Sequence, residues 1–429
     1  MERLFQLTGP NGCGKTLALR GIGESPHLMS TLLPLPQFAE PPVRTSAVGF
    51  QAGQNVVFSR SVRSLLTVPL VFAGLPIGEA NARLDSTLGH FNFGYLLNRD
   101  YLTLSGGERQ FVALFSCMLS DVDLYLLDDP VVMMDQERAA KILWLVKEYF
   151  ADHYDRRCAI ASVRLADYAD LHIDSVVHLG YSPDPCQCLE KFDRLLASLQ
   201  RIRRPWSEVL LESVTISPFG LPLIREQSQR FQSDEIVLIT GANGAGKTCL
   251  LHALAGIEQP GSGSIALLEA GHMLQPPVVG KNCVYLPQQF LNLVGFETIS
   301  EELGTSTAPR WWRQILEFLY DWRILHPRLR VPESSLGERH FCNIIAALSA
   351  LARDPAVAVL LLDEPDSGLD ELHCRLLTRT FHWLAKQNYV VAVVTHRPHL
   401  YYEGGASKVG VRELAVTDQR LVPGKAAAA

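Results

Sequence analysis

The octet GANGAGKT at residues 241–248 repeats, with small changes, the octet GPNGCGKT at residues 9–16. Each octet follows an apolar run that predicts a strand, EIVLIT or RLFQLT, and precedes an apolar pattern that predicts a helix. Glycines in such a turn let backbone N–H groups point towards phosphate oxygens, and the lysine adds a positive charge. The sequence therefore predicts a phosphate-binding loop in each half of the chain.

The whole chain is an internal duplication. Lys15 and Lys247 occupy the same place in the two octets and lie 232 positions apart. LSGGERQ at residues 104–110 and SSLGERH at residues 334–340 follow at nearly the same distance in each half. Next in each half comes an apolar run that ends in acids, DLYLLDDP or VLLLDEPDSGLD, and then a second apolar run that ends in SVR or THR. These runs predict buried parallel strands with polar groups at their carboxyl ends.

Composition limits the classes of protein that this chain can belong to. Its 429 residues are 47% hydrophobic and 20% charged, which predicts two globular domains. The net charge of -6 argues against broad nucleic-acid binding. No apolar run reaches the roughly 18 residues of a membrane span, and no secretory signal pattern opens the chain, so we expect a cytoplasmic location. Nine cysteines, mostly isolated, predict reduced thiols, and the pair Cys186 and Cys188 lacks a second pair for a zinc site.

The order of these motifs resembles the nucleotide-binding cassettes of the ABC ATPase family, twice over. Each half has a P-loop, a glutamine (Gln51 or Gln288), a signature like LSGGERQ and an acidic strand end, and the second half adds a TH pair. The resemblance implies two tandem α/β ATPase cores, each with a helical subdomain, that bind ATP and Mg²⁺ and hydrolyse ATP.

The duplication also predicts the domain boundaries. We expect domain 1 at residues 1–181, a linker at 182–209, domain 2 at 210–423, and an artificial tail at 424–429. Only eight residues precede Gly9, so domain 1 is predicted to lack the family's leading strands and its adenine-stacking aromatic residue. In domain 2, Phe219 is the candidate for stacking on adenine.

Two segments have apolar faces that permit more than one interpretation. The linker places Leu189, Phe192 and Leu196 at helical spacing, which predicts an amphipathic helix that closes domain 1, with docking on a partner as the alternative. The segment 309–325 carries three tryptophans, and its aromatic residues could form core or a docking surface.

The family resemblance assigns roles within domain 2. It implies that Glu364 activates the attacking water, that Gln288 contacts the metal or this water, and that His396 bonds the γ-phosphate. The residues expected to hold Mg²⁺ are Thr248, Gln288 and Asp363 in domain 2, and Thr16, Gln51 and Asp128 in domain 1. The residues expected to contact ATP are Gly241, Asn243, Gly244, Gly246, Lys247 and Thr248; Gly9, Asn11, Gly12, Gly14, Lys15, Thr16 and Gln51; Ser105, Gly106 and Gly107; and Ser335 and Gly337.

Three substitutions depart from the family pattern. Asp129 stands where the catalytic glutamate is expected, and Val163 stands where the switch histidine is expected. In the second signature, Leu336 replaces a glycine. A carboxylate misplaced by about 1 Å can cost on the order of a hundredfold in rate, and valine cannot hydrogen-bond a phosphate.

These substitutions gather in one site if the family's geometry holds. Two ABC cassettes pair head to tail, so that each ATP lies between the P-loop of one and the signature of the other. Asp129 and Val163 then share a site with SSLGERH, whereas Glu364 and His396 share the other with LSGGERQ. We therefore expect one hydrolytic site and one that mainly binds ATP.

The resemblance leaves two classes of function open. The sequences around Gln51 and Gln288 are most similar to the Gln-loop regions of energy-coupling-factor importers, which favours an ATPase subunit docked on separate membrane proteins at the cytoplasmic face. An exporter subunit fits almost as well. The alternative is a soluble tandem cassette that acts on ribosomes, but such proteins typically carry a long charged linker and an NHLD-like loop, where this chain has a short linker and PDSGLD.

Overall fold

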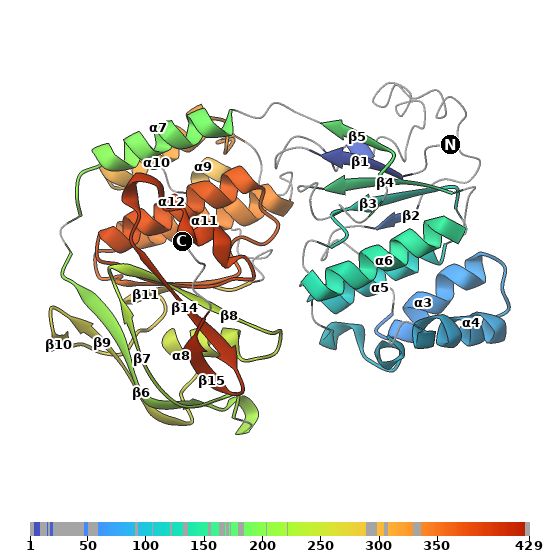
Figure 1. Ribbon diagram of the computed structural model, residues 1–429, viewed down its shortest axis with the longest axis horizontal. Coiled ribbons are helices and arrows are strands. Elements are labelled where there is room, and N and C mark those ends of the chain that lie inside the picture. The colour runs from blue at the N-terminus through green and yellow to red at the C-terminus, as the bar shows by residue number, and fades with distance from the viewer. Residues whose placement is uncertain are drawn as a thin grey trace. The chain divides into compact units, whose positions relative to one another are not determined.

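The structure is a computed structural model of the full chain. It describes residues 4–8, 15, 18–19, 47–49, 59–90, 93–104, 106–120, 122–131, 136–152, 156–162, 168, 171, 173–178, 184–202, 204–220, 222–288, 298–303, 308–328 and 336–424. The chain forms two compact units, Met1–Ser182 and Pro183–Ala429. Each unit contains its own sheets and helices (Figure 1).

The first unit is built on a five-stranded sheet in which every described strand pairing is parallel. The strand order is β2-β3-β4-β1-β5. The strands are β1 (Leu4–Thr8), β2 (Ala47–Gly49), β3 (Leu124–Asp128), β4 (Arg157–Ser162) and β5 (Ser175–His178). Strand β3 is apolar and fully buried, as a parallel strand covered on both faces must be.

The helices of the first unit share one apolar core with this sheet. They are α3 (Val62–Phe72), α4 (Ile77–His90), α5 (Gly106–Met118) and α6 (Gln136–Asp152), with two 3-10 turns, η2 (Gly94–Leu96) and η3 (Tyr101–Thr103). Figure 1 shows α5 and α6 along one face of the sheet, and Phe111, Phe115 and Val146 join one core with Tyr125 and Leu127 of β3. Helices α3 to α5 are inserted between β2 and β3.

The second unit repeats this order and adds strands. Its larger sheet has the order β11-β12-β13-β8-β14-β15. Its strands are β8 (Glu235–Gly241), β11 (Cys283–Leu286), β12 (Val359–Asp363), β13 (Val390–Val394), β14 (Gly410–Thr417) and β15 (Arg420–Pro423). Only β15 is antiparallel to its neighbour. The five parallel strands correspond one to one with those of the first unit, which confirms the predicted tandem α/β fold.

A separate antiparallel sheet, of order β10-β9-β6-β7, is present in the second unit. Its strands are β6 (Ser207–Ile216), β7 (Ile224–Gln232), β9 (Ser262–Glu269) and β10 (His272–Met273). Strand β6 begins at Ser207, inside the segment predicted to be linker. At the other end of the unit, the N–H of Gly424 donates to Glu413 O (2.9 Å).

The helices of the second unit include an insertion like that of the first. Helices α9 (Ile299–Glu302), α10 (Arg310–Asp321) and α11 (Leu336–Arg353) lie between β11 and β12 in the sequence. The others are α7 (Pro185–Ser198), α8 (Lys247–Leu254) and α12 (Glu371–Lys386), with the 3-10 turns η5 (Pro218–Gly220), η8 (Pro398–Tyr402) and η9 (Gly405–Ser407). Both units thus carry the helical insertion that the family resemblance implies.

Among the described residues, no single helix is long and apolar enough to cross a membrane. The bent pair Val62–Phe72 and Ile77–Leu88 reaches that length and composition only when taken together, and its break turns the chain by 119°.

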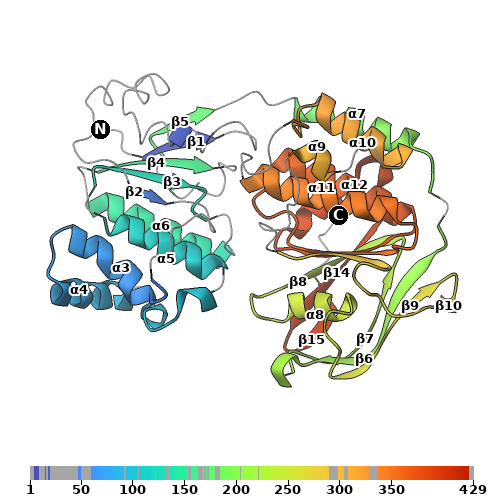
Figure 2. The same ribbon diagram turned by 180° about the vertical axis from the view of Figure 1, so that it is seen from behind.

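The amphipathic helix α7 packs on the second unit, so the prediction that it closes the first is wrong. Asp184 caps the helix by accepting from Cys186 N (2.9 Å), and the apolar face of the helix joins the core of α10 and α12. The rings of Phe192 and Phe318 lie 5.0 Å apart, and Arg379 of α12 pairs with Asp193 at 3.2 Å. Figure 2 shows α7 beside α10. Helical spacing had identified the apolar face correctly but carries no information on which surface covers it.

The aromatic segment 309–325 contributes mainly to this same core. Trp312 is fully buried, and its indole N–H donates to Ser349 Oγ at 2.7 Å. The ring of Trp311 lies 5.0 Å from that of Trp383 on α12. The core interpretation of this segment is therefore confirmed for Trp312.

We predict that Phe192→Ala destabilises the second unit by about 3 kcal/mol, because it removes a buried ring from between α7 and α10. Urea unfolding gives the free energy, and hydrogen exchange locates the loss. Exchange should rise in α10 and α12. The matched control is Gln187→Ala, an exposed position on the same helix. Faster exchange confined to the first unit would contradict this assignment of α7.

Candidate active site

The second phosphate-loop octet adopts a turn that requires glycine. Strand β8 ends at Gly241, whose φ is 144°, and a Cβ at this position would lie 2.6 Å from the carbonyl oxygen of Val416. Gly246 precedes α8 with a φ of 102°. The Lys247 ammonium is buried and donates to Gly241 O (2.9 Å) and Ala242 O (3.0 Å). The lysine charge and the helix N-terminus are thus held at one loop, as phosphate binding requires.

A hydroxyl and a carboxylate meet beside this loop. Thr248 Oγ1 donates to Asp363 Oδ2 at 2.7 Å, and Asp363 is the last residue of β12. Burial raises the pKa of Asp363 to about 6; the hydrogen bond from Thr248 opposes this rise, and the charge of Glu364 adds to it. Paired hydroxyl and carboxylate oxygens are ligands that suit Mg²⁺, and a divalent cation would offset the cost of the buried charge. The residues present therefore fit the metal.

Three predicted catalytic residues converge at the carboxyl ends of neighbouring strands. Gln288, Glu364 and His396 follow β11, β12 and β13, which lie side by side in the sheet. Gln288 Nε2 donates to Glu364 Oε2 at 2.9 Å, and His396 Nε2 lies 3.2 Å from Glu364 Oε1. The structure thus brings together all three side chains, although they are separated by up to 108 positions in the sequence.

The first unit has the same backbone at the equivalent acid. Asp129 has a φ of 44° and its N–H donates to Ala161 O at 2.9 Å. Glu364 has a φ of 52° and its N–H donates to Val394 O at the same distance. Because the two backbones match, the shorter side chain of Asp129 is the local difference between the two positions.

Several predicted positions cannot be compared in this way. Lys15 and Asp128 are buried in the first unit. Gly106 opens α5, while Leu336 and Gly337 open α11. The backbone of Phe219 belongs to η5, and its side chain is outside the described part, so its stacking role stays a prediction. The predicted residues that lie outside the described part are Gly9, Asn11, Gly12, Gly14, Thr16, Gln51, Ser105, Val163 and Ser335.

The last residue of each signature reaches the turn that carries the acid, which the sequence had not indicated. Gln110 Nε2 donates to Asp129 O at 2.8 Å in the first unit. In the second unit, His340 Nε2 lies 3.1 Å from Pro365 O. The shared position of the two residues in LSGGERQ and SSLGERH was the available signal. Each signature helix is therefore tied to the acidic turn of its own unit.

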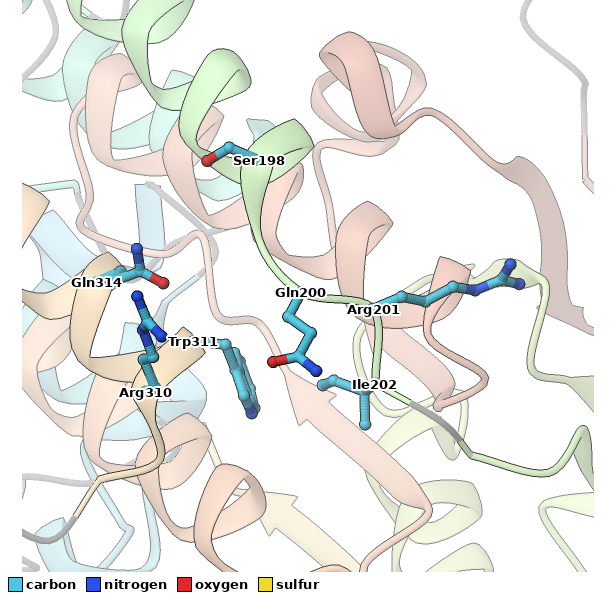
Figure 3. Close-up of a pocket in the computed structure, with 7 residues that line it drawn as sticks. All are labelled: Ser198, Gln200, Arg201, Ile202, Arg310, Trp311 and Gln314. Carbon is cyan, nitrogen blue, oxygen red and sulfur yellow. The ribbon is translucent and has the colours of Figure 1, made fainter.

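A separate cavity of about 510 Å³ lies between α10 and the segment after α7. Figure 3 shows Arg310 and Gln314 together on α10, Trp311 facing Gln200 and Ile202, and Arg201 pointing away from them. None of its lining residues belongs to the repeated motifs. The cavity is therefore not part of the site described above.

Comparisons with known proteins agree with this geometry. The family model described as "ABC transporter" matches residues 1–132 and 224–367, which together exceed half of the chain. A protein of Treponema denticola, named as an ABC transporter ATP-binding protein, is 26% identical over 91% of this chain and 85% of its own length. A similarly named protein of Streptomyces coelicolor is 24% identical over 93% of this chain and 85% of its own length.

Solved structures share the fold at lower identity. A structure titled "RNase-L Inhibitor" has a TM-score of 0.57 and 19% identity, and covers 96% of this chain and 83% of that one. A ribosome-bound archaeal structure of Pelota and ABCE1 has a TM-score of 0.63 and 18% identity, and covers 98% of this chain and 74% of that one. At such identity these likenesses show the fold alone.

We predict that His340 makes the protein sensitive to acid. Burial lowers the pKa of His340 to about 4 from the usual 6.5, so the folded protein keeps a neutral imidazole where the unfolded chain binds a proton. Its contribution to stability is therefore lost as the pH falls from about 6.5 towards 4. The variant His340→Gln has the residue of the first signature at this position and cannot bind the proton. Its loss of stability between pH 7 and pH 5 should therefore be smaller than that of the unmodified protein by about 1 kcal/mol.

Urea unfolding of the unmodified protein and of His340→Gln, each at pH 7 and at pH 5, measures this difference. The control is His272→Gln, which changes an exposed histidine on β10 and should leave the acid sensitivity as it is. An equal loss of stability in His340→Gln and the unmodified protein would contradict the prediction.

Proposed function

The chain belongs to the ABC transporter family and hydrolyses ATP, and we propose that it is the energising subunit of a membrane transporter with one hydrolytic and one ATP-holding site. The observation that carries the proposal is the convergence of Gln288 and His396 on the Glu364 carboxylate in the second unit. The first unit has Asp129 at the position of Glu364 and Val163 at the position of His396.

In the proposed hydrolytic site, Glu364 is the general base. Gln288 Nε2 donates to one oxygen of its carboxylate, and His396 Nε2 lies 3.2 Å from the other, so these two side chains hold the carboxylate in one orientation. Lys247 and the loop N–H groups would bind the phosphates, and His396 would bond the γ-phosphate, as the family resemblance implies. When bound by Thr248 and Asp363, Mg²⁺ would supply charge neutralisation for the transferred group.

The first unit would bind ATP but hydrolyse it slowly. Asp129 starts from the same backbone as Glu364 and is one methylene shorter, which moves the carboxylate back by about 1 Å. Valine at position 163 offers no hydrogen bond to phosphate or base. Lys15 and Asp128 are retained, and both belong to the part of the site that binds nucleotide and metal.

The distribution of these defects supports head-to-tail pairing of the two units. Under that pairing, the site with Asp129 and Val163 also receives the altered signature with Leu336, and the site with Glu364 and His396 receives the intact LSGGERQ. If each signature served its own unit instead, both sites would carry a fault. Pairing in trans leaves one complete site.

The names of the relatives support a transporter. Proteins that match over more than 90% of this chain are named as ABC transporter ATP-binding proteins. The resemblance of the segments around Gln51 and Gln288 to energy-coupling-factor importers favours import. The segment that joins the cores offers no support for a ribosomal role, since α7 has only 14 residues and packs on its own unit.

We predict that Glu364→Gln lowers ATP turnover by at least about a hundredfold, whereas Asp129→Asn changes it by less than about threefold. The amide keeps the shape of each side chain and removes only its ability to accept a proton. Turnover should be measured in the reconstituted complex, with ATP binding measured in parallel. A comparable loss in both variants would mean that Asp129 also serves as a base and that the two sites are equivalent.

The signature variants provide the matched control for pairing in trans. Ser105→Ala should reduce turnover as Glu364→Gln does, because both residues belong to the proposed hydrolytic site. Ser335→Ala should leave most of the turnover intact. The opposite pattern would assign each signature to its own unit.

We also predict that the protein purifies from membranes with an integral membrane protein. The measurement is affinity purification from detergent-solubilised membranes, followed by mass spectrometry, with sedimentation of the same lysate through a sucrose gradient. Enrichment of one membrane protein in stoichiometric amount supports the transporter. Sedimentation with ribosomes in an ATP-dependent manner would replace it with the ribosomal alternative.

A further inference from the structure

A buried carboxylate joins the two loops that carry Glu364 and His396. Asp366 is 5% exposed and lies two residues after Glu364. Its Oδ1 accepts from Thr395 Oγ1 at 2.9 Å and from Tyr401 OH at 3.2 Å. Thr395 is the residue immediately before His396. Asp366 therefore bonds from the loop of the base to the loop of the histidine.

The hydroxyl of Thr395 extends this connection across His396. Thr395 Oγ1 donates to Asp366 and accepts from the N–H of Arg397 at 2.8 Å. The Arg397 guanidinium also lies 3.5 Å from the backbone carbonyl oxygen of Asp366. The backbone on both sides of His396 is thus fixed by bonds that lead to one carboxylate. A change in this carboxylate is expected to move His396 relative to Glu364.

The first unit shows that the fold does not need this carboxylate. Val131 occupies the position of Asp366, is buried, and packs in the apolar core. The turn before it has the same backbone hydrogen bond, from the N–H of Asp129 to Ala161 O. Ser162, the counterpart of Thr395, accepts instead from Gln6 Nε2 of β1. An apolar side chain therefore completes the same turn.

The buried charge and the histidine occur together in this protein. The second unit has Asp366 with His396, and the first has Val131 with Val163. Burial of a carboxylate is costly unless it is paired and hydrogen-bonded. Thr395 and Tyr401 donate those hydrogen bonds to the Asp366 carboxylate in the second unit. The first unit has Ser162 and Tyr168 at the same positions, with Val131 in place of the carboxylate. The Asp366 carboxylate is costly to bury, and the first unit folds with Val131 in its place. We therefore explain the carboxylate by its effect on the adjacent site of Glu364 and His396.

We propose that Asp366 is a positioning residue for ATP hydrolysis, which acts through Thr395 to hold His396 within hydrogen-bonding distance of Glu364. The inference rests on the proposed role of His396 in the hydrolytic site. It adds a group that would act through Thr395 and not on the nucleotide itself. It also adds a further difference between the two units, beyond Asp129, Val163 and Leu336.

The test is a double-mutant cycle of Asp366→Val and His396→Ala in the full chain, with turnover and ATP affinity measured for each variant. Asp366→Val alone should lower kcat at least about tenfold and leave the Kd for ATP within about twofold. In the His396→Ala background the same change should lower kcat by less than about twofold, because the group that it positions is already absent. Asp366→Asn retains an acceptor for Thr395 and should keep more activity than Asp366→Val.

Each other outcome overturns the inference. Equal fold-losses in the two backgrounds would mean that Asp366 acts on general stability and not through His396. An unchanged kcat in Asp366→Val would exclude any role in hydrolysis. If Asp366→Val does not fold, Thr395→Val takes its place in the cycle, because it removes the hydroxyl that links Asp366 to the loop of His396 and keeps nearly the native volume. A His396→Ala variant with full activity would instead contradict the proposed role of His396 in hydrolysis. That result differs from equal fold-losses in the two backgrounds, which would contradict only the role of Asp366.

Discussion

The parallel pairing of β12 between β11 and β13 is the constraint on which the site depends. Strands that run in the same direction end at the same edge of a sheet, so Gln288, Glu364 and His396 reach one point from three distant parts of the sequence. The remaining contacts refine that placement. The P-loop follows β8, next to β13, which brings Lys247 and Thr248 to the same edge.

Both units have this parallel arrangement of strands, and they differ in the side chains at the carboxyl ends of the strands. Asp129 and Glu364 have the same left-handed backbone and the same hydrogen bond to the neighbouring strand. A duplicated backbone with altered side chains permits loss of chemistry without loss of fold, because packing of the sheet depends on its apolar residues and not on the acids at its edge. The first unit therefore provides an internal reference for what the fold requires, and Val131 is the clearest case.

Buried and partly buried polar groups tie the catalytic loops to the rest of the second unit. His340 connects the signature helix to Pro365. Asp366, the residue after Pro365, accepts hydrogen bonds from Thr395 and Tyr401. Such groups are costly to bury and have strict hydrogen-bond geometry, so they fix orientation more closely than apolar contacts do. The proposal for Asp366 follows from this property. It also explains why a charge lies in a turn that an apolar residue can complete.

The sequence by itself determined the duplication, the phosphate loops, the strands that end in acids and the position of every altered motif residue. These features are local, since spacing and residue type decide them. Only the tertiary structure decided that α7 belongs to the second unit, that Gln110 and His340 reach the acidic turns, and that Asp366 bonds to Thr395. An apolar face or a buried polar group does not specify its partner from the sequence, because that partner is selected by packing between residues as distant as Phe192 and Phe318.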